Sequence, residues 1–400
     1  MAISQKMVEF GARASWIRRM FEEGARLKAQ YGPEQVCDFS LGNPDLPPPP
    51  EFQRVLREVA ADERPGVHGY MPNRGWPEVC AAVAARVGRE QEMAVAGDEI
   101  VMTCGAAGGL NVVLKALLDP GDEVIILAPF FVEYHFYVDN HGGVVKVAPT
   151  SADFLLDPAA VARAITPRTK AVIINSPNNP SGRIYPATLL TELGEVLNEA
   201  GRRHGRPIFL VADEPYRQIV FDQHRVPSVF AAYPNSIVVS SSSKELSLPG
   251  ERIGYIAVHP AISDREALLA ALILANRILG FVNAPALIQR VVARLQEVTV
   301  DSAVYSRRRR LLCDILAGAG YQFVPPEGAF YLFPKSPLAD ETAFVRLLAE
   351  ERILAVPGRG FGMPGYFRLA FCVEDAVIER ATTGFQRARD KAAQLGRETR

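Results

Sequence analysis

Short apolar runs alternate with amphipathic helical patterns through the middle of the chain, from about residue 97 to residue 260. The apolar runs lie at 99–102, 123–127, 144–147, 171–174, 208–211, 237–239 and 253–257. They are almost continuously apolar, which is typical of strands in a mostly parallel sheet with helices on both faces. The pattern therefore predicts a large α/β domain with three layers around a mostly parallel, seven-stranded sheet.

A different pattern follows towards the C-terminus. After residues 283–285 a helical periodicity continues towards Leu316, and its first apolar positions are Leu287, Ile288, Val291, Val292 and Leu295. Two short apolar runs, at 330–333 and 367–371, and a charged helical pattern come after it. We interpret residues 285–400 as a smaller α+β domain and residues 47–284 as the large domain.

Residues 1–46 are expected to form an N-terminal arm and part of the small domain. Trp16, Ile17, Met20, Phe21 and Leu27 recur at helical spacing, so this helix could pack an apolar face against the small domain. The four prolines at 47–50 predict a stiff connector into the large domain.

Composition and charge narrow the class of protein. A chain of 400 residues that is 48% hydrophobic can bury two cores of unequal size. The net charge is -1, from 44 basic and 45 acidic residues, so neither nucleic acid nor an anionic membrane is expected as a partner. The basic run at 307–310 lacks interleaved aromatic residues and is interpreted as a solvated helix face.

The spacing of the cysteines and the N-terminal sequence indicate in which cellular compartment the protein is expected. The five cysteines are far apart and never form a CxxC pair, which predicts a reducing environment without disulfides or structural zinc. The N-terminus lacks an apolar signal core, and no uninterrupted apolar run of about 18 residues is present to span a bilayer. We therefore expect a cytoplasmic protein.

One lysine follows a predicted strand among hydroxyl side chains, in the sequence SSSSKELSLPGER at 240–252. Partial burial there would lower the pKa of Lys244 and make its amine a nucleophile towards a carbonyl. Taken alone, Lys244 would be interpreted as a surface lysine at a strand end. Ser241 and Ser243 share one face of the strand, however, and hydroxyls together with Arg252 form a plausible phosphate site.

Three more polar stretches follow predicted strands. Asp213 comes directly after an apolar run, where it would be either a helix cap or turn residue or a carboxylate with a buried cationic partner; Tyr216 follows three residues later. The stretch 175–182, NSPNNPSG, has the composition of a simple turn. The stretch 103–109, TCGAAGG, would bring backbone amides and a helix N-terminus to a phosphate, although it is weak evidence by itself.

The positions of these stretches are more informative than any one of them. Ligands of doubly wound sheets bind outside the carboxyl ends of the strands, where all four stretches occur. One ligand would match them all, because pyridoxal 5'-phosphate offers an aldehyde, a phosphate, a ring nitrogen and a ring oxygen.

In this order, over nearly the whole chain from 41–44 to 367–369, the motifs resemble the pyridoxal-phosphate-dependent aminotransferases of fold type I, in the aspartate-aminotransferase-like class I and II group. The resemblance implies that Lys244 binds the cofactor aldehyde covalently and that Asp213 pairs with the pyridinium nitrogen. It also implies that Tyr216 and Asn179 bind the ring oxygen and that Phe131 stacks on the ring.

The resemblance further assigns the phosphate and the substrate. The implied phosphate ligands are Ser241, Ser243, Arg252 and the backbone amides of Gly105, Ala106 and Ala107. Arg368 matches the arginine that binds the substrate α-carboxylate, beside Asn179, and Gly42 lies in the loop that closes over it. Tyr70 matches a tyrosine that reaches the phosphate of the neighbouring subunit, so a homodimer with shared sites is expected.

Two departures from the family pattern affect only details. Ala106 and Ala107 replace a hydroxyl or a lysine that family members often carry, so phosphate binding would depend more on backbone amides and Arg252. Phe131 replaces the more common Tyr or Trp and keeps an aromatic face without a hydrogen bond.

The implied activity is transamination between an L-amino acid and a 2-oxo acid by a ping-pong mechanism, with Lys244 as general base and acid. Arg277 lies near the position of an arginine that selects dicarboxylates, but it is offset by about one residue and is interpreted as a surface arginine. A β-eliminating carbon-sulfur lyase would use the same lysine, aspartate and arginine. A pyridoxal-phosphate-binding regulator would need an added DNA-binding domain, for which the residues before Gly42 are too few.

Overall fold

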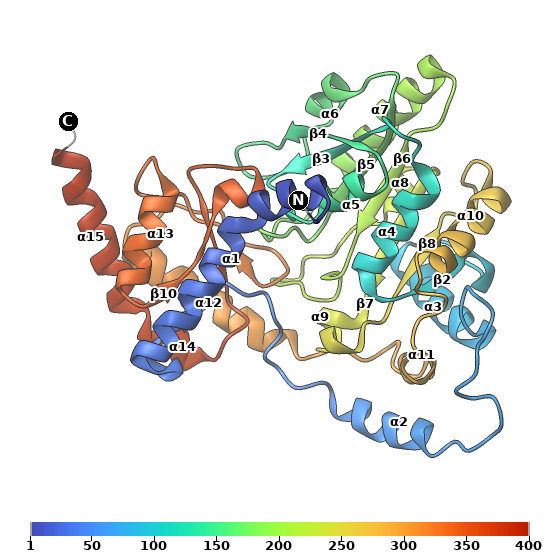
Figure 1. Cartoon of the computed structure of the whole chain (residues 1–400), viewed down its shortest axis with the longest axis horizontal. Coiled ribbons are helices and arrows are strands. Elements are labelled where there is room, and N and C mark those ends of the chain that lie inside the picture. The colour runs from blue at the N-terminus through green and yellow to red at the C-terminus, as the bar shows by residue number, and fades with distance from the viewer. Residues whose placement is uncertain (1, 399–400) are drawn as a thin grey trace.

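A computed structural model describes the backbone of residues 2–398, and the side chains of that range apart from 12–21 and 396–398. Its largest sheet has seven strands in the order β2-β8-β7-β6-β5-β3-β4 (Figure 1). They are β2 (Ile100–Thr103), β3 (Glu123–Ala128), β4 (Val144–Pro149), β5 (Thr169–Asn175), β6 (Phe209–Asp213), β7 (Ser236–Ser241) and β8 (Gly254–Val258). Only β8 runs antiparallel to its neighbours, so the predicted mostly parallel sheet is confirmed.

Helices cover both faces of this sheet, which explains why its strands are apolar throughout. Successive strand residues face opposite sides, and Ile125 and Leu210 pack in one core while Ile126 and Val211 pack in the other. The helices are α2 (Pro50–Ala60), α3 (Pro77–Glu90), α4 (Gly105–Leu117), α5 (Tyr134–Asn140), α6 (Pro158–Ala164), α7 (Ala187–His204), α8 (Val229–Ala232), α9 (Ser242–Glu245), α10 (Arg265–Ile278) and α11 (Ala286–Ala293). Two 3₁₀ turns, η2 (Gly97–Glu99) and η3 (Pro249–Glu251), complete this part.

A separate core lies in the C-terminal part of the chain. Its strands are β9 (Tyr331–Leu332), β11 (Val356–Pro357) and β12 (Phe367–Ala370), which pair antiparallel in the order β11-β12-β9, and β10 (Ile353–Leu354), which pairs parallel with β1 (Cys37–Asp38). Its helices are α12 (Ser302–Gly318), α13 (Glu341–Glu350), α14 (Asp375–Arg380) and α15 (Thr382–Glu398), with 3₁₀ turns η1 (Pro33–Gln35) and η4 (Gly358–Phe361). This small α+β unit includes residues 37–38 of the N-terminal arm through β1.

The helical pattern after residue 285 is not one long helix, and that prediction is wrong. It forms α11 and α12, and Asp301 caps the start of α12 by accepting a hydrogen bond from Ala303 N at 2.9 Å. The two helices face different cores, since α11 packs on α2 and α3 while α12 packs in the small unit. We therefore propose a domain boundary within residues 294–301 instead of after residue 284.

The basic run on α12 is solvated as predicted at Arg307 and Arg310, which are exposed, but not at its two central residues. Arg308 and Arg309 are only 5% and 8% exposed. Arg308 bonds to both Asp45 and Asp375, at 2.8 and 3.0 Å. Arg309 pairs with Asp222 at 2.6 Å, so these arginines tie α12 to neighbouring segments.

Helix α1 (Gln5–Tyr31) runs from the large unit to the small one (Figure 1). Near its start, Phe10 packs edge-on against Phe136 of α5, with ring centroids 5.0 Å apart. Near its end, Leu27 packs with Leu354 of β10. The side chains predicted to form its apolar face, Trp16, Ile17, Met20 and Phe21, lie outside the described residues. None of the described helices combines the length and apolar character needed to cross a membrane.

Candidate active site

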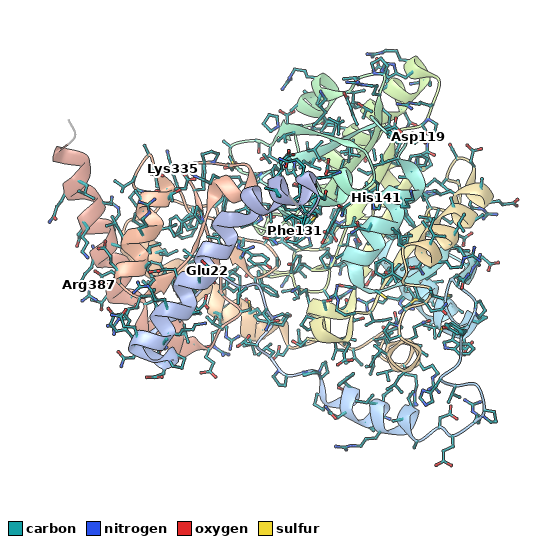
Figure 2. All side chains as sticks on the ribbon, viewed as in Figure 1. Glu22, Asp119, Phe131, His141, Lys335 and Arg387 are labelled. Atoms are coloured by element: carbon teal, nitrogen blue, oxygen red, sulfur yellow. The ribbon has the colours of Figure 1, made fainter. Side chains whose placement is uncertain are left out.

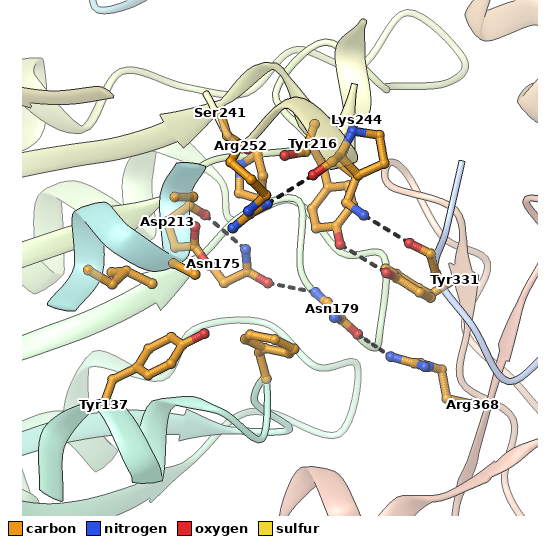
Figure 3. Close-up of a pocket in the computed structure, with 18 residues that line it drawn as sticks. Tyr137, Asn175, Asn179, Asp213, Tyr216, Ser241, Lys244, Arg252, Tyr331 and Arg368 are labelled. Atoms are coloured by element: carbon orange, nitrogen blue, oxygen red, sulfur yellow. Dashed lines mark hydrogen bonds between the residues drawn. The ribbon is translucent and has the colours of Figure 1, made fainter. Parts of the chain in front are cut away.

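A cavity of about 320 Å³ lies where the carboxyl ends of β5, β6 and β7 meet the small unit (Figure 3). The predicted site residues that line it are Gly42, Ala106, Ala107, Phe131, Asn179, Asp213, Tyr216, Ser241, Ser243, Lys244, Arg252 and Arg368. Parallel strands bring their carboxyl ends to one edge of a sheet, which is why residues so distant in sequence converge. Phe131 lies on the large-unit side of this junction (Figure 2).

Lys244 extends into the cavity from α9, the short helix that follows β7. Its Nζ donates a hydrogen bond to the carbonyl of Gly42 at 2.9 Å and lies 5.6 Å from the centre of the Phe330 ring. Burial lowers the pKa of Lys244 to about 8, and the positive charges of Arg368 and Arg252 act in the same direction. A larger fraction of neutral amine is therefore present near pH 7 than for an exposed lysine, as attack on a carbonyl requires.

Asp213 is the last residue of β6 and is buried. Tyr134 donates a hydrogen bond to its Oδ2 at 2.6 Å, whereas its buried Oδ1 has no hydrogen-bond partner among the described residues. Burial raises the pKa of Asp213 to about 6, against the effect of the Tyr134 hydrogen bond. A buried acceptor without a donor destabilises a fold by about 1–3 kcal/mol, so this oxygen is suited to a ligand with a cationic N–H.

A chain of hydrogen bonds joins the backbone of Asp213 to the small unit (Figure 3). Asn175 Nδ2 donates to the carbonyl of Asp213 at 2.8 Å, and the amide of Asn179 donates to Asn175 Oδ1 at 2.7 Å. Arg368 Nη1 then donates to Asn179 Oδ1 at 3.0 Å. The chain fixes Asn179 between the two ends of the site.

Arg368, in β12, lies between two aromatic rings. Its Cζ is 4.7 Å from the centre of the Tyr331 ring and 4.8 Å from that of Phe361. Nη2 donates to the carbonyl of Ser40 at 2.7 Å, while the buried Nε has no partner among the described residues. Burial lowers the pKa of Arg368, but a guanidinium stays charged near neutral pH and retains donors for a carboxylate.

Two tyrosines lie between Lys244 and Arg368. The hydroxyls of Tyr216 and Tyr331 are 2.9 Å apart. Burial raises the pKa of both, that of Tyr331 to about 12, so both remain neutral donors. A Cβ on Gly42 would lie only 1.9 Å from Tyr331 Oη, so the close approach of this loop requires glycine.

The opposite end of the cavity suits a phosphate. Helix α4 begins at Gly105, whose φ of 73° is left-handed and whose Cβ, if present, would lie 2.9 Å from Arg252 Nη2. Ala106 and Ala107 in its first turn line the cavity with Arg252. A helix N-terminus, a guanidinium and the Ser241 hydroxyl together favour a dianion. With the open Asp213 oxygen and the Lys244 amine, these groups fit pyridoxal phosphate.

Two predicted residues lie outside the lining of this cavity. Gly105 contributes as the start of α4, whereas Tyr70 is 92% exposed. Arg277 is exposed on α10 and is not among the lining residues either.

Sequence reasoning missed several residues of the site. Asn175, Tyr137 and Tyr331 line the cavity, and Tyr134 and Phe361 support Asp213 and Arg368. Asn175 begins the NSPNNPSG stretch and could have been singled out there. The aromatic residues carried no signal beyond an apolar pattern, because only tertiary contacts reveal their partners.

Comparison with known proteins agrees with this geometry. Residues 34–385 match the family model for aminotransferase class I and II. The chain is 33% identical over 365 residues to the aspartate/prephenate aminotransferase of Thermus thermophilus, covering 88% of this chain and 91% of that protein. It is 31% identical over 383 residues to the aspartate aminotransferase of Thermotoga maritima, covering 94% and 96%.

Solved structures are similar over the whole length. An aminotransferase from Eubacterium rectale superposes with a TM-score of 0.94 at 39% identity, covering 98% of this chain and 99% of that one. The aspartate aminotransferase of Thermus thermophilus with maleate gives a TM-score of 0.84 at 28% identity, covering 97% and 100%. The chain therefore belongs to the class I and II aminotransferases, and it is a transaminase that uses pyridoxal phosphate.

Proposed function

We propose that this protein moves an amino group from an L-amino acid to a 2-oxo acid by a ping-pong mechanism within the cavity described above. The observation that carries the proposal is that three groups face one cavity: the amine of Lys244, the open Oδ1 of Asp213 and the guanidinium of Arg368. Bound pyridoxal phosphate would supply an aldehyde that combines with amines and a protonated ring that accepts electrons from the substrate Cα.

The protein's own residues would do the rest. Arg368 and Asn179 would bind the α-carboxylate and orient the substrate. Lys244 would take the proton from the substrate Cα and deliver it to the carbon of the cofactor's aldehyde group. Its lowered pKa suits both proton transfers. Asp213 would keep the ring nitrogen protonated, and Tyr216 would donate a hydrogen bond to the ring oxygen.

The phosphate end and the ring face would position the cofactor. The proposed phosphate ligands are Ser241, Ser243, Arg252 and the amides of Gly105, Ala106 and Ala107. Phe131 would lie against the ring and exclude water from one face.

The covalent assignment is tested by borohydride reduction of the holoenzyme followed by peptide mapping. We expect the pyridoxyl group on Lys244. An adduct on another lysine would overturn the assignment of Lys244, although not the family.

The class of amino acid side chain that the site accepts is not assigned by these residues. The relatives are named for aspartate or for aspartate and prephenate, but the cations that line this cavity in the described residues are Lys244, Arg252 and Arg368, each with a role assigned above. Aspartate, aromatic and aliphatic donors should therefore be compared against 2-oxoglutarate, pyruvate and oxaloacetate, with ammonia measured separately. Preferential amino transfer from one class of donor would identify the substrate, and ammonia release without amino transfer would contradict the proposed reaction.

We also propose a homodimer in which Tyr70 completes the phosphate site of the partner. The support is that Tyr70 is 92% exposed in the single chain and lies outside the cavity of its own chain. Tyr70→Ala should weaken cofactor binding, and Lys244→Ala should abolish the chemistry. Mixing the two variants at limiting cofactor should raise activity above that of either one, because a mixed dimer contains one site with neither change. No recovery from verified mixed dimers would contradict the shared site. Location in the cytoplasm stays a prediction.

A further inference from the structure

A cluster of charged and amide side chains lies behind the cavity, between α3 and the ends of β6 and β7. We call it the rear cluster; its members are Arg86, Glu90, Gln91, Glu214, Arg217 and Glu245. Arg86, Glu214 and Glu245 are 6%, 3% and 4% exposed. None of these side chains lines the cavity, so they do not contact a ligand there.

The hydrogen bonds of the rear cluster converge on two acidic residues. Arg86 binds Glu245 with both terminal nitrogens, Nη1 to Oε1 at 2.8 Å and Nη2 to Oε2, and its Nε donates to Glu90 at 2.8 Å. Glu214 accepts from Arg217 Nη1 at 2.8 Å and from Gln91 Nε2 at 3.1 Å. Both acidic residues directly follow a residue of the active site in sequence: Glu245 follows Lys244, and Glu214 follows Asp213.

The backbone that carries Lys244 needs such an anchor. Helix α9 is only four residues long, far too short to be stable by its own hydrogen bonds. Ser247, just beyond it, has a left-handed φ of 53°. The carbonyl of Glu245 accepts hydrogen bonds from Val300 N at 2.7 Å and Thr299 Oγ1 at 3.1 Å, in the segment that leads into α12. Helix α9 is thus held from outside by the side chain and the carbonyl of one residue.

General stability does not explain this arrangement. Burying an ion pair is often no better for stability than packing apolar side chains of the same size, because both charges lose their hydration. A bidentate guanidinium–carboxylate pair does, however, fix the relative position of its two residues. The pair between Arg86 and Glu245 fixes the position of α9 relative to α3, a longer helix of 14 residues.

We propose that Arg86 and Glu245 are positioning residues for Lys244: their buried ion pair holds α9 so that the Lys244 amine meets the cofactor aldehyde. This inference rests on the proposed covalent role of Lys244. Without the pair, α9 has more freedom, and the bond between the amine and the aldehyde forms less favourably. Ser243, a proposed phosphate ligand, also lies on α9, but the other contacts of the phosphate and the ring are made outside this helix and are unaffected.

The test compares two forms of the cofactor on the apoenzyme. Pyridoxal phosphate bonds covalently to Lys244, whereas pyridoxamine phosphate has no aldehyde and binds without that bond. For Glu245→Gln we expect affinity for pyridoxal phosphate to fall about tenfold or more, in line with the effect of a small misplacement of a reacting group. Affinity for pyridoxamine phosphate should fall only about threefold or less, because this form can lose no more than the contact with Ser243. Equal losses for both forms, or no loss, would overturn the proposal.

Two further variants separate positioning from stability. Arg86→Lys keeps the charge without the two parallel hydrogen bonds and should show the same selective loss at smaller size. In the double variant Arg86→Met with Glu245→Met, apolar packing replaces the pair, and thermal stability should stay close to that of the wild type. A selective loss that persists in this stable variant supports positioning, and full recovery of pyridoxal phosphate binding contradicts it.

Arg309→Met is the matched control. Arg309 is 8% exposed and paired with Asp222, but it lies on α12 in the small unit. It should change affinity for the two cofactor forms equally or not at all; a selective loss here would overturn the inference. Failure of the wild type to form a reducible bond at Lys244 would instead count against the proposed function.

Discussion

At the ends of β6 and β7, charged side chains on one side of the backbone have oppositely charged partners, and those on the other side have none among the described residues. Asp213 and Lys244 face the cavity, while the residues that follow them, Glu214 and Glu245, face the rear cluster. Each rear carboxylate has an arginine partner within 2.8 Å. On the cavity side, Asp213 Oδ1 has no partner in the described part of the chain, and the Lys244 amine bonds to a neutral carbonyl.

Adjacent residues therefore have different roles: the cavity-side residue serves the chemistry, and the residue after it holds the backbone. A paired buried carboxylate fixes the backbone, whereas an unpaired one costs about 1–3 kcal/mol until a ligand supplies its partner. Variants on the cavity side should therefore impair cofactor chemistry with little loss of fold stability. Variants on the rear side should instead lower fold stability, or impair the chemistry only by displacing the cavity-side residues.

The largest effect is expected for Lys244→Ala on the cavity side. The half-reaction with an amino acid should slow about 10⁴-fold, because proton transfer at Cα loses its base and acid. Thermal stability should be unchanged or higher, since a desolvated amine is removed. Single-turnover absorbance and thermal unfolding measure the two quantities. Lys335→Ala, at an exposed lysine, is the control, and a slowing of less than tenfold for Lys244→Ala would contradict the assignment.

Amide substitutions one residue apart sharpen the comparison directly. Asp213→Asn removes the charge that would hold a buried cation. Transition-state stabilisation should fall by about 3–5 kcal/mol, which lowers kcat/KM roughly 10²- to 5 × 10³-fold. Glu214→Gln should change kcat/KM by less than about threefold, because burial raises the pKa of Glu214 to about 7 and an amide resembles its protonated form. Both variants should be measured with saturating cofactor. Equal losses of kcat/KM would contradict the different roles of the cavity side and the rear side.

Much of this organisation could be predicted from the sequence. Lys244 and Asp213 can be singled out because they follow predicted strands, where one ligand's partners would gather, whereas Arg368 is assigned only through the resemblance of the motifs to a known family. The sheet was predicted because strands buried on two faces must be apolar throughout. These features depend on local pattern and chain order, which a sequence carries explicitly.

Other features depend on which partner a side chain meets. The break between α11 and α12 was missed because apolar periodicity does not say which core a helix faces. Arg86 and Arg308 belong to a residue type that is mostly exposed, so only the structure reveals their buried carboxylate partners. Tyr134 was missed for the same reason, since its role is defined by one hydrogen bond to Asp213.

The lowered pKa of Lys244 gives a pH test of the cavity side. Below about pH 8 the amine is mostly protonated and unreactive, and above it the amine is neutral. Covalent capture of pyridoxal phosphate by the apoenzyme should therefore accelerate about tenfold per pH unit well below the pKa and level off above about pH 8. Binding of pyridoxamine phosphate, followed in parallel, corrects for other titrations. An acceleration that continues towards pH 10.5 would show that Lys244 titrates as an exposed lysine.

The smallest effect is expected for Tyr134→Phe, which removes the hydrogen bond to Asp213 Oδ2. That bond holds the pKa of Asp213 down, so the pKa should rise further above its ordinary value and more of the carboxyl should be protonated near neutral pH. Because the protonated acid cannot pair with a cationic ring nitrogen, cofactor affinity should fall about three- to tenfold at pH 6.5. The deficit should shrink towards pH 8.5, where Asp213 is ionised in both proteins.

The control for this change is Tyr233→Phe, which removes a comparable buried hydrogen bond, to the carbonyl of Ile208 at 2.8 Å, away from the cavity. It should reduce fold stability by about 1 kcal/mol and leave the pH dependence of cofactor affinity unchanged. A deficit in Tyr134→Phe that is independent of pH would mean that the tyrosine only packs against Asp213. A deficit that disappears at high pH would show that one phenol helps to keep the cavity-side carboxylate ionised.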